Sequence, residues 1–77
     1  MKDLLLFIVK ALVDNPEAVD IAETQEAEDS VLFEIHVAES DMGKVIGKQG
    51  RIAKAIRTVM KSAANKEHKK VTVDIKE

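Results

Sequence analysis

The chain has 77 residues, no Cys, Trp or Tyr, and only two aromatic side chains, Phe7 and Phe33. This length predicts one small domain over residues 1–77 with an aliphatic core, and the absence of Cys excludes disulfides, Fe–S clusters and thiolate zinc sites. The net charge of −2 conceals a division, because residues 1–41 carry two Lys against eleven acidic residues, whereas residues 42–77 carry ten Lys and Arg against three acidic residues.

The first half of the chain predicts a helix and two strands. Residues 2–13 are apolar around most of a helical wheel, which is typical of a helix that is deeply buried or shared with another chain. Pro16 ends this helix, since proline cannot supply a helical donor. Residues 19–24 and 31–37 alternate apolar and polar side chains, so they predict two strands that pair as a hairpin around a turn at residues 26–30.

The second half predicts two helices and a strand. Residues 39–41 have the side-chain chemistry of a helix N-cap and predict a short helix that ends near Ile46. Residues 51–64 predict a longer helix, a basic loop follows, and residues 71–75 predict the last strand. The order is therefore α-β-β-α-α-β, an α+β fold.

Gly47-Lys48-Gln49-Gly50, between the two helices, is the centre of the functional prediction. Its glycines allow a tight turn with accessible backbone N–H groups, which precede a helix N-terminus that favours an anion. Lys48 lies inside the loop, and three further cations flank it in sequence: Lys44, Arg51 and Lys54. Arg57 and Lys61 continue the stripe of Lys54 along the helix. A phosphate is therefore the expected ligand, although on charge alone the basic half could simply complement the acidic half across the fold.

A nucleotide-hydrolysing P-loop is excluded by spacing. That motif needs four residues between its glycines and a Ser or Thr after its Lys. Here Gly43 and Gly47 are separated by three residues, and Gln49 follows Lys48. Catalysis in general lacks a basis in the sequence, because Cys is absent and no Ser has a nearby His. We expect no enzyme activity and no cofactor.

Ile46-Gly47-Lys48-Gln49-Gly50, within this order of elements, resembles the type II K-homology (KH) domain over essentially the whole chain. The resemblance implies a three-stranded sheet with helices packed on one face, and a GXXG loop that clamps the backbone of four nucleotides of single-stranded RNA. It implies RNA contacts by Lys44, Val45, Ile46, Gly47, Lys48, Gln49, Gly50, Arg51, Lys54, Arg57, Lys69 and Lys70. In that set Val45 and Ile46, with Ile52, would form an aliphatic floor. The last strand (Val71 to Val73) and the loop before it (Lys66 to Lys70) would form the opposite wall.

The resemblance also implies partners and a cellular role. It implies an RNA chaperone or post-transcriptional regulator that touches cell-wall growth and cell shape, and that acts as a homodimer or with a second KH-containing protein. Both Phe residues are predicted in apolar faces, so bases have no aromatic platform, and binding should be weak, salt-dependent and broad in sequence preference. The alternative is an interaction module that dimerises through its first helix while a partner carries most of the RNA binding.

A membrane location is not expected. The apolar run at residues 4–9 is far shorter than the roughly 20 residues of a membrane span. Asp14, Asn15 and Pro16 follow it, where a secretory signal would need a small-residue cleavage site. The sequence therefore predicts a cytoplasmic protein.

Overall fold

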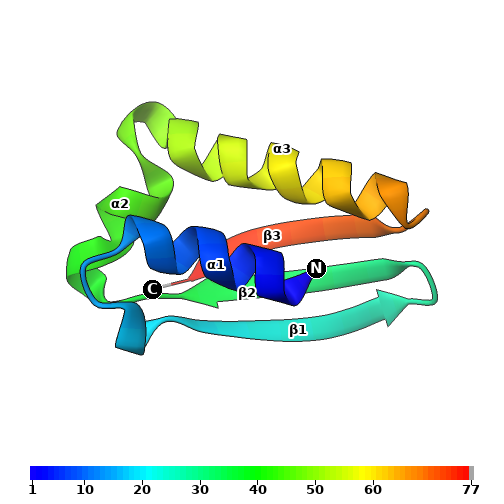
Figure 1. Cartoon of the computed structure of the whole chain (residues 1–77), viewed down its shortest axis with the longest axis horizontal. Helices are drawn as coiled ribbons and strands as arrows, with labels where there is room; N and C mark the ends of the chain where they lie inside the picture. The colour runs from blue at the N-terminus through cyan, green and yellow to red at the C-terminus, as the bar shows by residue number, and fades with distance from the viewer. Residues whose placement is uncertain (77) are drawn as a thin grey trace.

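The computed structural model describes residues 1–76 and confirms the predicted α+β fold and order of elements (Figure 1). The elements are α1 (Lys2–Leu12), β1 (Asp20–Ala27), β2 (Ser30–His36), α2 (Met42–Ile46), α3 (Arg51–Lys66) and β3 (Lys70–Lys76). Short 3₁₀ turns precede β1 and α2, and another forms the loop between α2 and α3.

The three strands form one mixed sheet with β2 in the centre. β1 pairs antiparallel with β2, as expected for a hairpin, whereas β3 runs parallel to β2, with Val73 opposite Phe33. A parallel neighbour requires a crossover connection, and α2 and α3 provide it. Figure 1 shows α1 and α3 on the same face of the sheet, as the resemblance implied. The edge of β3 thus lies beside α3.

The core lies between this face of the sheet and the two longer helices. Val31, Phe33 and Ile35 alternate along β2 and are buried. From the helices, the buried apolar side chains are Leu5 and Val9 of α1, Val45 of α2, and Ala53, Ile56, Met60 and Ala64 of α3. Apart from Phe33 the core is aliphatic, as the composition predicts.

Three elements extend beyond their predicted bounds. β1 continues to Ala27 through Gln25 and Glu26, which are exposed and carry no apolar alternation, and its pairing shifts register at this point. β3 gains a Lys at each end of its predicted span. α3 continues to Lys66 and ends without a glycine, because His68 adopts a left-handed conformation (φ 59°) and the Lys69 N–H donates to the Ala64 carbonyl at 2.9 Å. This geometry satisfies the terminal carbonyls of the helix.

α1 is less enclosed than its composition suggests. Leu4 is 39% exposed and Phe7 is 73% exposed, so this helix is not deeply buried within the chain, the first of its two predicted alternatives. The side chains that face the sheet are Leu5 and Val9, and Phe7 lies on the opposite side of the helix. Periodicity could not separate these positions, because nearly every residue of the helix is apolar. Within residues 1–76, no helix has the length and apolarity needed to span a membrane.

Candidate nucleic-acid interface

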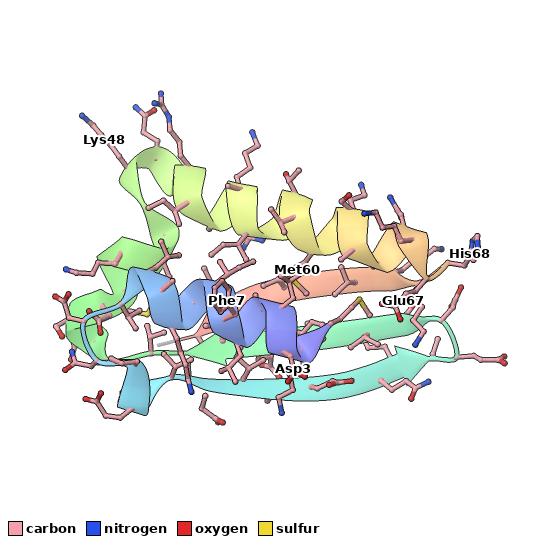
Figure 2. The ribbon with its side chains drawn as sticks, in the orientation of Figure 1. Asp3, Phe7, Lys48, Met60, Glu67 and His68 are labelled. Carbon is pink, nitrogen blue, oxygen red and sulfur yellow. The ribbon has the colours of Figure 1, made fainter. Side chains whose placement is uncertain are left out.

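The Gly47–Gly50 loop projects from one end of the molecule, with the Lys48 side chain pointing away from the protein (Figure 2). Gly47, Gln49 and Gly50 all have positive φ, at 76°, 59° and 74°. The Gly47 N–H donates to the Gly43 carbonyl at 2.9 Å, and the Gly50 N–H donates to the Gly47 carbonyl at 3.1 Å. Within residues 1–76, the amides of Lys48 and Gln49 have no main-chain partner. Two free N–H groups beside a lysine can bind an anion.

The first glycine of the loop rests on α3. A Cβ atom placed on Gly47 would lie 2.5 Å from Ile52 Cγ1, whereas one placed on Gly50 would meet nothing within 4 Å. Ile52 is half-buried and supports the loop from beneath. The resemblance implied that Ile52 forms part of an aliphatic floor for bases. In the structure Ile52 instead lies on the side of α3 that faces α1.

A groove runs from the loop along α3 and β3 and consists of two adjoining hollows. The first, of about 400 Å³, is lined by Ile46, Gly50, Ala53 and Arg57, with residues 74–76 of β3 opposite. The second, of about 300 Å³, is lined by Arg57 and Lys61, with residues 71–74 opposite. From Gly50 to Lys61 a helix rises about 17 Å at 1.5 Å per residue, enough for several nucleotides.

Arg57 connects the two walls of this groove. Its Nε donates to the Val73 carbonyl at 3.0 Å, so the side chain crosses from α3 to the outer edge of β3. β3 is an edge strand, and such strands present unpaired N–H and C=O groups. The groove therefore offers a guanidinium, aliphatic side chains and backbone hydrogen-bonding groups along one line.

Most of the predicted site residues gather around the loop and the start of this groove. Ile46 is 36% exposed and lines the first hollow. Arg51 donates from Nη2 to Gln49 Oε1 at 3.4 Å, a long contact at the surface of the loop. Lys54 is exposed on α3, one helical turn before Arg57. Arg51 and Lys54 lie near the loop because α3 begins directly after Gly50.

Four predicted site residues lie elsewhere. The Val45 side chain is fully buried in the core and cannot contact a ligand. Lys44 points toward the end of α1, where its Nζ lies 3.3 Å from Asp14 Oδ2. Lys69 and Lys70 follow His68, which lies at the opposite end of the molecule from Lys48 (Figure 2). The 16 residues of α3, about 24 Å, separate the two ends. Of the implied wall, β3 therefore lies opposite α3 near the Gly47–Gly50 loop, and the loop before β3 does not.

Asp41 has a structural role that the sequence did not reveal. Its side chain was expected to cap the short helix, but it makes no capping hydrogen bond there. Instead its carboxylate is 1% exposed and accepts three hydrogen bonds from the turn after α1. The donors are the Asp14 N–H (3.2 Å), the Asn15 N–H (3.0 Å) and Asn15 Nδ2 (3.1 Å). No local pattern could indicate these contacts, because 26 or 27 residues separate the partners.

The hydrogen bonds keep this carboxylate ionised. Burial acts to raise the pKa of Asp41, but the three hydrogen bonds from Asp14 and Asn15 outweigh this effect. Together with the charge of Lys44, they hold the pKa below its ordinary value. In the described residues 1–76, no group of three or more His, Asp or Glu side chains is arranged to hold a metal ion.

Comparisons with known proteins agree with this geometry. A family model described as "KhpA/KhpB, KH domain" matches residues 2–75. A protein named RNA-binding protein KhpA from Clostridium perfringens is 60% identical over 75 residues, which cover 97% of this chain and 99% of the relative. The protein of the same name from Chlamydia trachomatis is 47% identical over 77 residues, which cover 100% of this chain and 97% of the relative. No solved structure gives a significant match.

Proposed function

Because the chain belongs to the KhpA/KhpB KH-domain family, we propose that it is a cytoplasmic protein with a single KH domain that binds single-stranded RNA by clamping the backbone in its GKQG loop. One observation carries the proposal: the two free amides of the loop and Lys48 lie at the mouth of a groove lined by aliphatic and cationic side chains. Relatives named as RNA-binding proteins support it. The family is non-enzymatic, which confirms the prediction that the chain is not an enzyme.

The groove suggests how RNA would lie. The amides and side chains of Lys48 and Gln49 would bind phosphates, with Arg51 and Lys54 beside them, while the glycines let the backbone approach. Bases would then rest over Ile46 and Ala53 and face the edge of β3. Phe33 is buried, and Phe7 lies on α1, so neither lines this groove. Lys69 and Lys70 would contact only an RNA that extends past its far end.

The dependence of affinity on salt tests this proposal. If three or four phosphates are neutralised, raising the salt from 50 to 200 mM should weaken binding of a labelled single-stranded RNA by roughly 20- to 50-fold, since the logarithmic slope is about 0.7 per phosphate. Fluorescence anisotropy measures this slope, with a duplex RNA as the control ligand. A salt-independent affinity, or a preference for the duplex, would contradict the clamp.

The proposed cellular role is an RNA chaperone or post-transcriptional regulator, in a pathway that touches cell-wall growth and cell shape. A groove with no aromatic side chain among its lining residues fits this role, because it favours weak binding to many RNA sequences. Crosslinking the protein to RNA in growing cells and sequencing the bound fragments would identify the targets. Enrichment of transcripts for envelope synthesis supports the pathway, and a random sample of cellular RNA contradicts it.

We also propose that the protein pairs with a second KH domain through the groove between α1 and α3, on the other side of α3 from the RNA groove. This hollow, of about 360 Å³, is lined almost entirely by apolar residues: Ile8, Leu12, Ile52, Ala55, Ile56 and Val59, with Arg51 at its end. Val59 is 45% exposed, and Leu4 and Phe7 of α1 are exposed apolar side chains as well. Exposed apolar surface of this kind marks interaction sites.

A second copy of this chain fits the groove by charge. Arg51 and Glu67 lie eight residues before and after Val59, at the two ends of the exposed apolar strip. Two copies packed with antiparallel α3 helices around Val59 would place each Arg51 beside the partner's Glu67. A KhpB-type KH protein is the second candidate, and it would use the same surface.

Val59→Asp should shift the protein from dimer to monomer. The carboxylate would have to be buried without a partner in the apolar interface, which we expect to weaken dimerisation at least tenfold. Sedimentation equilibrium at micromolar concentration measures the change. The control is Ala27→Asp, which adds the same negative charge at the exposed end of β1. A wild-type protein that sediments as a monomer would rule out the homodimer, and an unchanged dimer in V59D would rule out this surface.

A further inference from the structure

We propose that Asp41 is a positioning residue for RNA binding: it fixes α2, and with it the GKQG loop, against the turn that follows α1. This inference rests on the proposed RNA-binding function of the loop. Asp41 lies six residues before Gly47, and its fully buried carboxylate accepts hydrogen bonds from the turn that follows α1. It therefore acts on RNA only through the backbone that it holds.

α2 depends on such contacts for its position. The helix has five residues, too few to be stable alone, because helix nucleation is unfavourable and few hydrogen bonds follow it. Val45 anchors one side of the helix in the core, and Asp41 anchors its N-terminus to Asn15. The Lys44–Asp14 ion pair adds a third, exposed contact to the same turn.

The position of α2 is passed directly to the loop. Gly47 is the C-cap of α2, and its N–H donates to the Gly43 carbonyl one turn earlier. On its other side Gly47 rests on Ile52 of α3. A rotation of α2 would therefore move Gly47 across Ile52 and change where the free amides of Lys48 and Gln49 point. Backbone amides bind a phosphate more tightly when their positions are fixed before the ligand arrives, because less conformational freedom is then lost on binding.

A carboxylate suits this position because three N–H groups converge on it. Two oxygens provide enough lone pairs for all three donors, whereas an amide offers a single acceptor oxygen and places an NH₂ group against a donor. Asp41→Asn should therefore loosen the link without removing volume. Asn15→Ala is milder, because it removes only the side-chain donor and leaves both backbone N–H bonds.

The test compares RNA affinity with loop order in the full-length protein. We expect D41N to bind a labelled single-stranded RNA octamer five- to twentyfold more weakly than the wild type, at a temperature where both are fully folded. N15A should lie between them. Val31→Ala is the control that lowers stability without touching the loop. It shortens a buried side chain at the start of β2, at the end of the strand away from α2. We expect V31A to bind the octamer like the wild type.

Hydrogen exchange at the hydrogen-bonded loop amides, those of Gly47 and Gly50, gives a readout that does not depend on RNA. Exchange there should accelerate in D41N and N15A but not in V31A. The proposal is overturned if D41N keeps its affinity within twofold of the wild type, or if the loop amides exchange no faster than in V31A. If the wild type itself does not bind the octamer, the proposed function fails, while the exchange data still decide whether Asp41 positions the loop.

Discussion

Replacing Lys48 and Gln49 together with Asp should lower the affinity for single-stranded RNA by about 30- to 100-fold. The change removes one charge-assisted phosphate contact and sets two carboxylates beside the RNA backbone, which together cost about 2–3 kcal/mol. The logarithmic salt slope should fall by about 0.7, as expected when one lysine–phosphate contact with a single strand is lost. Fluorescence anisotropy at several salt concentrations measures both effects.

The fold should survive this substitution. Both side chains are exposed, and Lys48 makes no ion pair in the described residues. Gln49 has a φ of 59°, in the left-handed region that Asp tolerates better than most residues. An Asp at this position could still accept the contact that Arg51 makes with Gln49. The thermal midpoint and the oligomeric state should therefore stay close to those of the wild type.

A matched control separates the loop from overall charge. Lys2→Glu with Gln25→Glu changes the net charge by −3, as K48D/Q49D does, at exposed positions on α1 and β1. This control should retain most of the affinity. Full RNA binding by folded K48D/Q49D would contradict the clamp. A wild-type protein that forms dimers but binds no RNA would favour the alternative, an interaction module whose partner carries the RNA binding.

Local patterns were sufficient to predict the order of elements and the site of the loop. Alternation along β2 and the break at Pro16 reflect local physics, and the two glycines mark a turn wherever the helices pack. The predictions failed where tertiary packing decides the outcome. Val45 and Ile46 are consecutive apolar residues in a helix of five, and only packing determines that Val45 faces the core while Ile46 lines the groove.

Charge patterns failed for the same reason. Lys44 precedes the loop in sequence, but its Nζ lies 3.3 Å from Oδ2 of Asp14, an acidic residue 30 positions earlier. Lys69 and Lys70 belong to the basic half, yet the length of α3 carries them to the far end of the molecule. The division of charge along the chain thus predicted an anionic ligand, but it did not indicate which cations lie beside the loop. Asp41 is a further residue whose role the local sequence does not indicate. Its side chain is typical of a helix cap, but it is buried and hydrogen-bonds to a turn that is distant in sequence.

The two glycines of the loop should differ sharply in their tolerance of a side chain. Gly47→Ala should destabilise the protein by roughly 2–6 kcal/mol, because backbone strain of about 1–3 kcal/mol adds to overpacking of similar size. Gly47 has φ 76° and ψ 172°, a region that is almost exclusive to glycine, and its new Cβ would lie 2.5 Å from Ile52 Cγ1. A rotamer change cannot relieve this clash, since Ile52 Cβ, fixed on the helix, lies at 2.9 Å.

Gly50→Ala should cost only about 1 kcal/mol, the strain of one left-handed residue, because open space surrounds the new methyl group. In a domain of this size each kcal/mol lowers the thermal midpoint by about 4–8 °C, so a difference of about 1–5 kcal/mol should separate the two variants by roughly 4–40 °C in calorimetry. Equal midpoints would mean that Ile52 does not hold the loop. In that case the support for the clamp would have to come from α2 alone.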